Sequence, residues 1–432
     1  MRSEAQTPVA DSPGWIMLFG FGARLFYLVF AHSYRFSLTH WVRFEMANLA
    51  YSLATNQGFS SPFGGHTGPS AWTAPVYPWL ISLAFRTFGS YSPAAAIAML
   101  MFNSVFSVLT IWIIYRIADH VFGKAVAVRS AWVWALLPDC IYWSVTWVWD
   151  TSLAAFLLSA LFLLTLEMEG KDRLSLWSGY GVLWGVAGLT STSVLAWLPF
   201  SGCWLAYQLH RRGKPFLLCT TLSALIFWAT LTPWLVRNYF AFGQLVFVRG
   251  NLGVELRSGN NAESEGDWVP VYHPTGNSFL YAQYKEMGEA AFVAEQARIA
   301  REWIGQHPNL FWRLSFRRCI FFWAGLPRQG LQEARNLVYL GTSVFAFGGL
   351  LLATTRRLHG VFLFATLLGF YPLVYYITFA ASRYRHPIDP ELVILAVFSI
   401  SSILGSLAVP SLAGAKSRPH AFHKTSEDYV VE

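Results

Sequence analysis

The chain has 432 residues, of which 55% are hydrophobic, 17% aromatic and only 12% charged. Soluble domains carry about 25% charged residues, so the composition excludes a soluble globular protein and indicates an integral membrane protein. The formal net charge of +8 fits either nucleic acid or an anionic membrane face as a partner, and its distribution along the chain decides between them.

Apolar stretches long enough to cross a membrane recur along the whole chain. A spanning helix needs about 20 mainly apolar residues, and we predict an all-α membrane protein with about ten spans in one domain over residues 1–410. The first span follows a mixed-charge start without a small-residue cleavage site, so we expect it to be retained. The stretches are 14–33, 93–118, 128–146, 151–167, 177–192, 193–209, 216–237, 335–354, 359–379 and 390–410.

Four short basic loops, in alternate connections, agree on one orientation. Lys and Arg mark the cytoplasmic side, so the positive charge is mostly an orientation signal and we expect no nucleic-acid partner. Both chain ends are then cytoplasmic, with 34–92, 147–150 and 238–334 outside and 411–432 a disordered cytoplasmic tail. The basic residues are Arg116, Lys124 and Arg129; Lys171 and Arg173; His210, Arg211, Arg212 and Lys214; and Arg356 and Arg357.

The first outside segment, 34–92, contains two predicted juxtamembrane helices. Met46, Leu49, Ala50 and Leu53 recur at helical spacing, which places Glu45, Asn48 and Ser52 on the opposite face of a helix at the membrane surface. A stop at Asn56 and Gly58 and a Gly- and Pro-rich loop follow. Residues 75–89 are apolar but short and broken by two prolines, so we expect a second surface helix there.

The long outside segment, 238–334, is expected to form a small extramembrane subdomain. It begins with polar, turn-rich sequence and continues in a helical stretch from about Ser278 to His307. The following stretch, 311–327, sets Arg313, Arg317 and Arg318 among Phe and Trp, which is typical of an interfacial helix that meets lipid phosphates. The four cysteines, Cys140, Cys203, Cys219 and Cys319, have neither disulfide nor metal spacing.

Two carboxylates are candidates for chemistry on the outside face. Glu45 taken alone is more readily an ordinary surface glutamate. Asp150 lies in a very short turn at the start of a predicted span, beside Trp143, Trp147 and Trp149, where a helix N-cap and a functional role are equally good interpretations.

Basic residues at outside span ends are the second class of candidate. Arg383, Arg385 and His386 lie in the sequence SRYRHPIDP, and Arg237 precedes Asn238 at the end of another span. They could be snorkelling interfacial anchors, but the positive-inside rule depletes this side of basic residues. Arginine also binds phosphate oxygens in a bidentate manner.

One arginine lies inside a predicted span. Arg24 is the clearest intramembrane cation, and such residues usually pair inside the bundle. Asp139 is its expected partner, and we favour a structural ion pair over a functional role for both residues.

We predict two carboxylates and several arginines on one face, beside aromatic surface helices that could hold a lipid chain. This combination favours a transferase with a lipid-phosphate donor. A carboxylate can act as general base toward an acceptor hydroxyl, and cations can neutralise the departing phosphate. The leading alternative is a transporter or lipid flippase, which would favour paired halves with broken spans. A third alternative is a noncatalytic scaffold.

The chain resembles the GT-C class of polytopic glycosyltransferases that use polyprenyl-phosphate sugars, including the protein O-mannosyltransferases (glycosyltransferase family 39) and the aminoarabinose transferases. The resemblance covers most of the layout: an acid with the spacing E-x-x-x-x-A-x-S-L-A at Glu45–Ala54, a Pro-Val-Tyr-Pro helix ending at Phe88-Gly89, and a span ending in Val121-Phe122-Gly123.

The resemblance implies a GT-C-like bundle and roles for individual residues. Glu45 occupies the position of the catalytic acid, which is often aspartate in the class, and Asp150 matches a second acid that binds metal or orients the acceptor. A divalent metal is possible, with Glu45 and Asp150 as ligands. Arg383, Arg385, His386 and Arg237 are expected to bind the donor phosphate, and Asn48, Trp72 and Tyr77 to contact the acceptor or the loop.

The expected function is inverting transfer from a polyprenyl-phosphate sugar to a protein, lipid or glycan hydroxyl. We expect it on the extracytoplasmic face of a bacterial inner membrane, among membrane lipids.

Overall fold

The computed structural model describes residues 11–36, 45–327 and 331–407. The predicted tail at 411–432 and the charged residues before position 11 lie outside this part of the chain. Within it the secondary structure is helical, with one isolated bridge between Ser60 and Pro69 and no strand.

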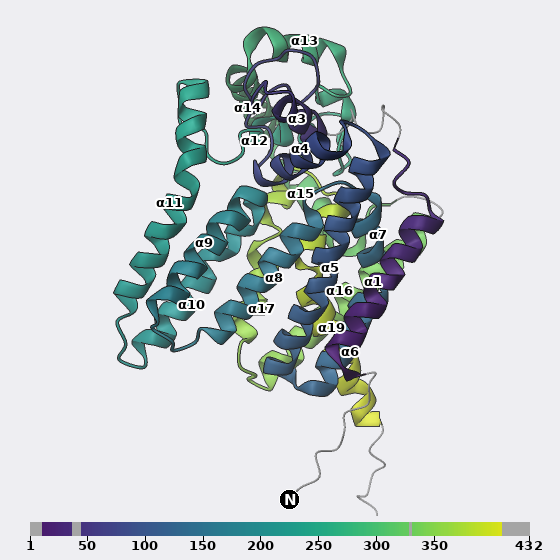
Figure 1. Ribbon diagram of the computed structural model, residues 1–432, viewed down its shortest axis with the longest axis vertical. Helices are drawn as coiled ribbons and strands as arrows, with labels where there is room; N and C mark the ends of the chain where they lie inside the picture. Colours follow the sequence, from purple (N-terminus) through teal and green to yellow (C-terminus); the bar gives the residue numbers. More distant parts are fainter. Residues whose placement is uncertain (1–10, 37–44, 328–330, 408–432) are drawn as a thin grey trace, which may run out of the picture.

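Most helices run roughly parallel in one bundle, and a smaller group lies across one end of it (Figure 1). The core of the bundle is a continuous cluster of buried apolar side chains. The bundle elements are α1 (Pro13–Phe30), α5 (Pro93–Phe122), α6 (Lys124–Leu136), α7 (Pro138–Thr146), α8 (Thr151–Glu167), α9 (Leu174–Thr190), η2 (Thr192–Trp197), α10 (Leu198–His210), α11 (Phe216–Phe242), α16 (Leu331–Thr355), α17 (Val361–Phe370), α18 (Leu373–Ile377) and α19 (Asp389–Leu407).

Five of the described helical segments are long and apolar enough to cross a membrane, and two more apolar helices are shorter. The number of ten spans therefore stays a prediction. One predicted span, 128–146, is divided at Pro138, because proline lacks the amide that would continue α6 but fits the first turn of α7.

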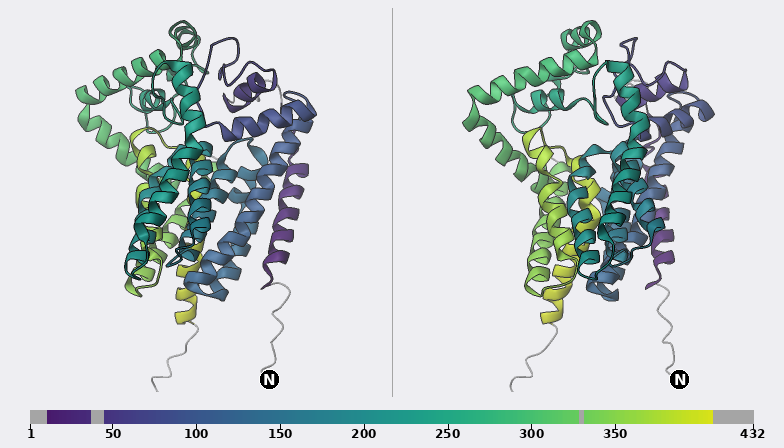
Figure 2. Two further views of the ribbon diagram at one scale, coloured as in Figure 1. Left: turned by 60° about the vertical axis from the view of Figure 1, so that its left-hand side comes forward. Right: turned by 90° about the vertical axis from the view of Figure 1, so that its left-hand side faces the viewer.

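The predicted orientation has a clear geometric counterpart. The described part of α1 begins and that of α19 ends at one end of the bundle, and the smaller helices cover the opposite end (Figure 2). The basic loops contact each other: Arg212 donates to the Glu169 carbonyl at 2.8 Å, His359 lies 2.6 Å from the Glu169 carboxylate, and Lys214 lies 2.9 Å from Asp172.

The end opposite these loops carries seven elements, which we call the cap. Two come from the first outside segment and five from the long one. They are α3 (Glu45–Ala54), α4 (Val76–Phe88), α12 (Leu252–Gly259), η3 (Pro270–Tyr272), α13 (Ser278–Met287), α14 (Glu289–Gln306) and α15 (Pro308–Ala324).

Helix α3 forms as predicted, but its polar face is not at a surface. Asn48 and Ser52 are each 3% exposed, because the following loop folds back over them and Asn48 Nδ2 donates to the Pro62 carbonyl at 2.9 Å. Helix α4 confirms the second short helix of the segment. Glu289, the first residue of α14, joins the loop between α3 and α4 to the long outside segment: its buried carboxylate accepts bonds from Ser70 Oγ, the Ala71 amide and Tyr284 Oη at 2.6–2.7 Å.

Two expectations about arginines are wrong. Arg24 does not pair with Asp139: it donates to Ser107 Oγ and to backbone carbonyls, and Asp139 pairs instead with Arg335 at 2.7 Å. Arg318 does not reach lipid phosphates, because its fully buried guanidinium donates to the Gly259 carbonyl and to Asn260 Oδ1. The buried guanidinium thereby joins α15 to the end of α12.

The end of α12 also contacts the segment just before Arg383. A Cβ at Gly259 would collide with the Thr378 carbonyl. Asn260 Nδ2 donates to the Ile377 carbonyl at 2.9 Å, and the Ala380 amide donates to the Gly266 carbonyl at 3.1 Å. These contacts hold the long outside segment against a part of the chain more than 100 residues away.

Candidate active site

Glu45 is the first residue of α3 and lies beside a histidine from the long outside segment. Its Oε1 is 3.6 Å from His273 Nε2, and the two side chains are 15% and 5% exposed. Burial raises the pKa of Glu45 to about 7, although Arg383 and Arg249 oppose the shift. A carboxylate in this range is half ionised near neutral pH and is suited to general base catalysis.

Asp150 occupies the N-cap position of α8, yet its side chain makes no capping hydrogen bond. It is 9% exposed. Burial raises the pKa of Asp150 to about 6, and Arg249 and Arg383 lower it. The cap interpretation therefore does not account for this carboxylate, which shares its two cations with Glu45.

Arg249 comes from the chain between α11 and α12 and is fixed on both sides. Its Nε donates to the Trp72 carbonyl at 3.1 Å, and its Nη2 lies 2.8 Å from Glu255 Oε1. Asn251 Nδ2 donates to the same carboxylate oxygen at 2.7 Å. This network ties the Arg249 guanidinium to both outside segments, through Trp72 and Glu255.

Arg383, in the short 3-10 turn η4 (Ser382–Tyr384), is the second shared cation. Its guanidinium lies over the rings of Trp149 and Tyr384 at 5.1 and 5.0 Å. No carboxylate lies within 4.0 Å of it in the described part of the chain, and its buried Nε has no hydrogen-bond partner there. Such a guanidinium has donors left for an anion.

Arg385 and His386 lie only two and three residues further on, but the structure does not bring them to this cluster. Arg385 is 3% exposed and pairs with Asp389 at 2.8 Å, while its Nη1 donates to Ser343 Oγ and the Tyr339 carbonyl. His386, in η5 (His386–Ile388), is fully buried against the ring of Trp134. Its Nδ1 is 3.4 Å from Asp389 but not in hydrogen-bond geometry.

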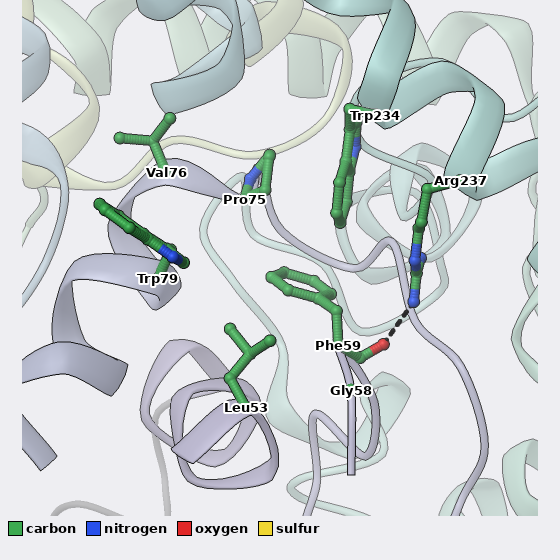
Figure 3. Close-up of a pocket in the computed structure, with 8 residues that line it drawn as sticks. All are labelled: Leu53, Gly58, Phe59, Pro75, Val76, Trp79, Trp234 and Arg237. Carbon is green, nitrogen blue, oxygen red and sulfur yellow. Dashed lines mark hydrogen bonds between the residues drawn. The ribbon is translucent and has the colours of Figure 1, made fainter. Parts of the chain in front are cut away.

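Arg237, near the end of α11, lies at a different place in the cap. Its Nη1 and Nη2 donate to the carbonyls of Ser70 and Phe59, each at 2.6 Å. It borders a cavity of about 500 Å³ with a mainly apolar lining (Figure 3). The lining residues are Leu53, Gly58, Phe59, Pro75, Val76, Trp79, Trp234 and Arg237.

The other three predicted residues, Tyr77, Trp72 and Asn48, are buried and contact the backbone or side chains next to the cluster. Tyr77 Oη donates to Asn103 Oδ1 at 2.9 Å, and Asn103 Nδ2 donates to the Trp147 carbonyl at 3.0 Å, which fixes the turn before Asp150. Trp72 is 2% exposed and offers its carbonyl to Arg249. Asn48 holds the loop, as described above.

Three members of the cluster were missed in the sequence: Arg249, Glu255 and His273. They lie in polar, turn-rich stretches, VRGNLGVELR and VYHPTGN, that resemble ordinary surface loops. The sequence signals were Arg249 and Glu255 on either side of Asn251, and a lone histidine before a proline. Neither pattern distinguishes a functional site from an ordinary turn.

The resemblance also allowed a divalent metal bound by Glu45 and Asp150. Over the described ranges, no group of three or more His, Cys, Asp or Glu side chains is arranged to hold a metal ion. The cluster consists of two carboxylates with raised pKa values, two arginines near both of them and a neutral histidine. Together they can accept a proton and bind an anion.

Part of the sequence matches a known family. Residues 72–236, less than half of the chain, match the model of a family described as dolichyl-phosphate-mannose-protein mannosyltransferase. The match includes Asp150, Trp72 and Tyr77 and ends one residue before Arg237; Glu45 precedes it. No curated protein matches the sequence.

The bundle and cap together resemble solved structures. The oligosaccharyltransferase of Archaeoglobus fulgidus, solved with Zn and sulfate, matches with a TM-score of 0.53 at 13% identity, over 91% of this chain and 49% of that one. The same organism's AglB, in complex with an inhibitory peptide and a dolichol-phosphate, matches with a TM-score of 0.52 at 13% identity, over 91% and 51%. This chain thus spans about half the length of those proteins.

A third solved structure is ArnT from Cupriavidus metallidurans bound to undecaprenyl phosphate. It matches with a TM-score of 0.41 at 13% identity, over 91% of this chain and 79% of that one, a likeness too weak to support an argument. The archaeal structures confirm the predicted fold class, an all-α bundle of the GT-C type.

Proposed function

We propose that the chain is a membrane glycosyltransferase of the GT-C class that transfers a sugar from a polyprenyl-phosphate donor to an acceptor hydroxyl, with Glu45 as the base; the partial family match and the shared fold support this. The observation that carries this proposal is the placement of Glu45 and Asp150 around the same two arginines, Arg249 and Arg383. A base and an anion site side by side are what displacement of a phosphate requires.

The proposed reaction is a single inverting displacement. The acceptor hydroxyl gives its proton to the Glu45 carboxylate, and its oxygen forms a bond to the anomeric carbon. The bond from that carbon to the phosphate oxygen breaks, and the electron pair stays on the phosphate, whose added charge meets Arg383 and Arg249. Asp150 orients the acceptor and keeps both guanidinium groups in place.

The lipid part of the donor has a suitable place beside the cap. The cavity next to Arg237 is lined by Leu53, Trp79 and Trp234 and adjoins α11, whose apolar stretch is only 11% buried and therefore open to lipid. We propose that part of the polyprenyl chain lies there. Glu45 and Leu53 are at opposite ends of α3, about 12 Å apart along its axis, so the sugar end can extend to the base.

We place the reaction on the extracytoplasmic face of a bacterial inner membrane. The support is the positive-inside rule together with the distance between the basic loops and the cap, which lie at opposite ends of the bundle (Figure 1). The acceptor is a protein, lipid or glycan hydroxyl.

The proposal is tested with purified protein in liposomes and radiolabelled polyprenyl-phosphate sugars of several kinds. We expect the wild type to release polyprenyl phosphate from one donor and to glycosylate an acceptor from a membrane extract. Lipid movement across the bilayer is followed in parallel with a fluorescent polyprenyl phosphate. Translocation of that probe, with every donor left intact, would favour a flippase and overturn the proposal.

The pH dependence follows from the two raised pKa values. The base must be ionised, so kcat/KM is expected to fall as the pH drops below about 7, which is the pKa of Glu45. Asp150, with a pKa of about 6, lies near the same two arginines, and protonation of its carboxylate is expected to add a second proton to the acid limb. In Asp150→Asn, kcat/KM should still fall at low pH, but the fall should follow the binding of one proton fewer than in the wild type. An acid limb below pH 5 in the wild type would contradict this assignment.

A further inference from the structure

We propose that His273 is a positioning residue for the base: its ring is locked with the proton on Nε2, and that N–H orients the Glu45 carboxylate. The inference rests on the proposed role of Glu45.

The imidazole of His273 is held in a tight aromatic enclosure. Its side chain is 5% exposed, and the rings of Phe63, Trp72 and Trp268 meet it edge to face at 5.5, 5.4 and 5.7 Å, with interplanar angles of 90°, 78° and 69°. Rotation of the ring would require these three side chains to move. The enclosure therefore fixes which nitrogen faces Glu45.

The other nitrogen fixes the tautomer. The backbone amide of Thr275 donates to His273 Nδ1 at 3.3 Å, and Thr275 Oγ1 lies 2.7 Å from the same atom. A backbone amide can only donate, so Nδ1 must present its lone pair. The ring proton is then on Nε2, the nitrogen that faces Glu45 Oε1 at 3.6 Å.

That separation is longer than a formed hydrogen bond, so the N–H is aimed at the carboxylate without yet closing on it. Such contacts often shorten when substrate binds. The charged groups around Glu45 are Arg383 from η4, Arg249 from the chain before α12 and Glu255 from the first turn of α12. Burial lowers the pKa of His273 to about 3, and Arg249 and Arg383 act in the same direction. The ring stays neutral, so it orients the carboxylate without adding the positive charge that would weaken it as a base.

Two substitutions separate orientation from packing. His273→Gln keeps an N–H donor near the position of Nε2, whereas His273→Leu fills the enclosure without a donor. We expect His273→Leu to lose about 10- to 100-fold in kcat with little change in donor KM, and its acid limb to move to higher pH. His273→Gln should recover most of the rate. His307→Leu, at an exposed site at the end of α14, is the control.

A spectroscopic measurement tests the tautomer without any donor. In protein with 15N-labelled histidine, the signals lost in His273→Gln belong to His273. We expect an unprotonated Nδ1 and a protonated Nε2, unchanged between pH 5.5 and 8. A protonated Nδ1, titration in this range, or equal rates for His273→Leu and the wild type would overturn the inference. If instead Glu45→Gln remains active while the tautomer is as expected, the assignment of the base fails and not that of the ring.

Discussion

Replacing Glu45 by glutamine is expected to reduce sugar transfer by about 100- to 10,000-fold, the usual contribution of a general base. The amide has almost the same volume as the carboxylate, so the fold should be unchanged, but it cannot take the acceptor proton. The effect should lie in kcat.

The same substitution is expected to leave donor affinity unchanged or to increase it. Glu45 lies near Arg383 and Arg249, and removal of its negative charge leaves both arginines more attractive to an anion. The donor should therefore bind as tightly as in the wild type or more tightly, which equilibrium binding with a labelled donor measures. Glu286→Gln, on the exposed side of α13, is the matched control. Activity of Glu45→Gln within about threefold of the wild type would show that Glu45 is not the base.

Replacing Arg383 and Arg385 by alanine should have opposite consequences, although only one residue separates them. Arg383 has no carboxylate partner in the described part of the chain and a buried Nε without an acceptor. Its loss should lower kcat/KM about 100- to 1000-fold, as for removal of other groups that stabilise a developing negative charge. The melting temperature should change little.

Arg385→Ala should instead damage the fold. Its guanidinium is 2.8 Å from the Asp389 carboxylate, and both side chains are at most 5% exposed. Breaking a buried pair leaves an uncompensated charge and costs about 3–5 kcal/mol of unfolding free energy. We expect poor expression and a clearly lower melting temperature in detergent. Arg383→Lys and Arg385→Lys keep the positive charge. They show how much of the kcat/KM and of the melting temperature, respectively, depends on guanidinium geometry. If Arg385→Ala melted normally but failed to bind donor, Arg385 and not Arg383 would be the phosphate ligand.

Much of the fold could be predicted because its signals are local. Apolar stretches, the short helices α3 and α4, and the asymmetry of the basic loops each depend on neighbouring residues, and the all-α class follows from them. The partner of a buried charge cannot be predicted from neighbouring residues in the same way. Arg24 and Asp139 seemed matched because both lie in predicted spans, yet Arg24 is satisfied by a hydroxyl and carbonyls and Asp139 by Arg335, nearly 200 residues away.

The sequence by itself determined that two carboxylates and a set of arginines end up at one end of a helical bundle, because hydropathy and loop charge fix which segments share a face. Only the tertiary structure decided which of them meet. Arg383 lies in the 3-10 turn η4 and Arg385 directly follows it, yet Arg383 lies near Glu45 and Asp150 without pairing with either, while Arg385 pairs with the buried Asp389. Arg249 and His273 join Glu45 because Arg318 and Gly259 hold the long outside segment against the chain before Arg383. Contacts of that kind depend on packing between distant segments, which no local pattern records.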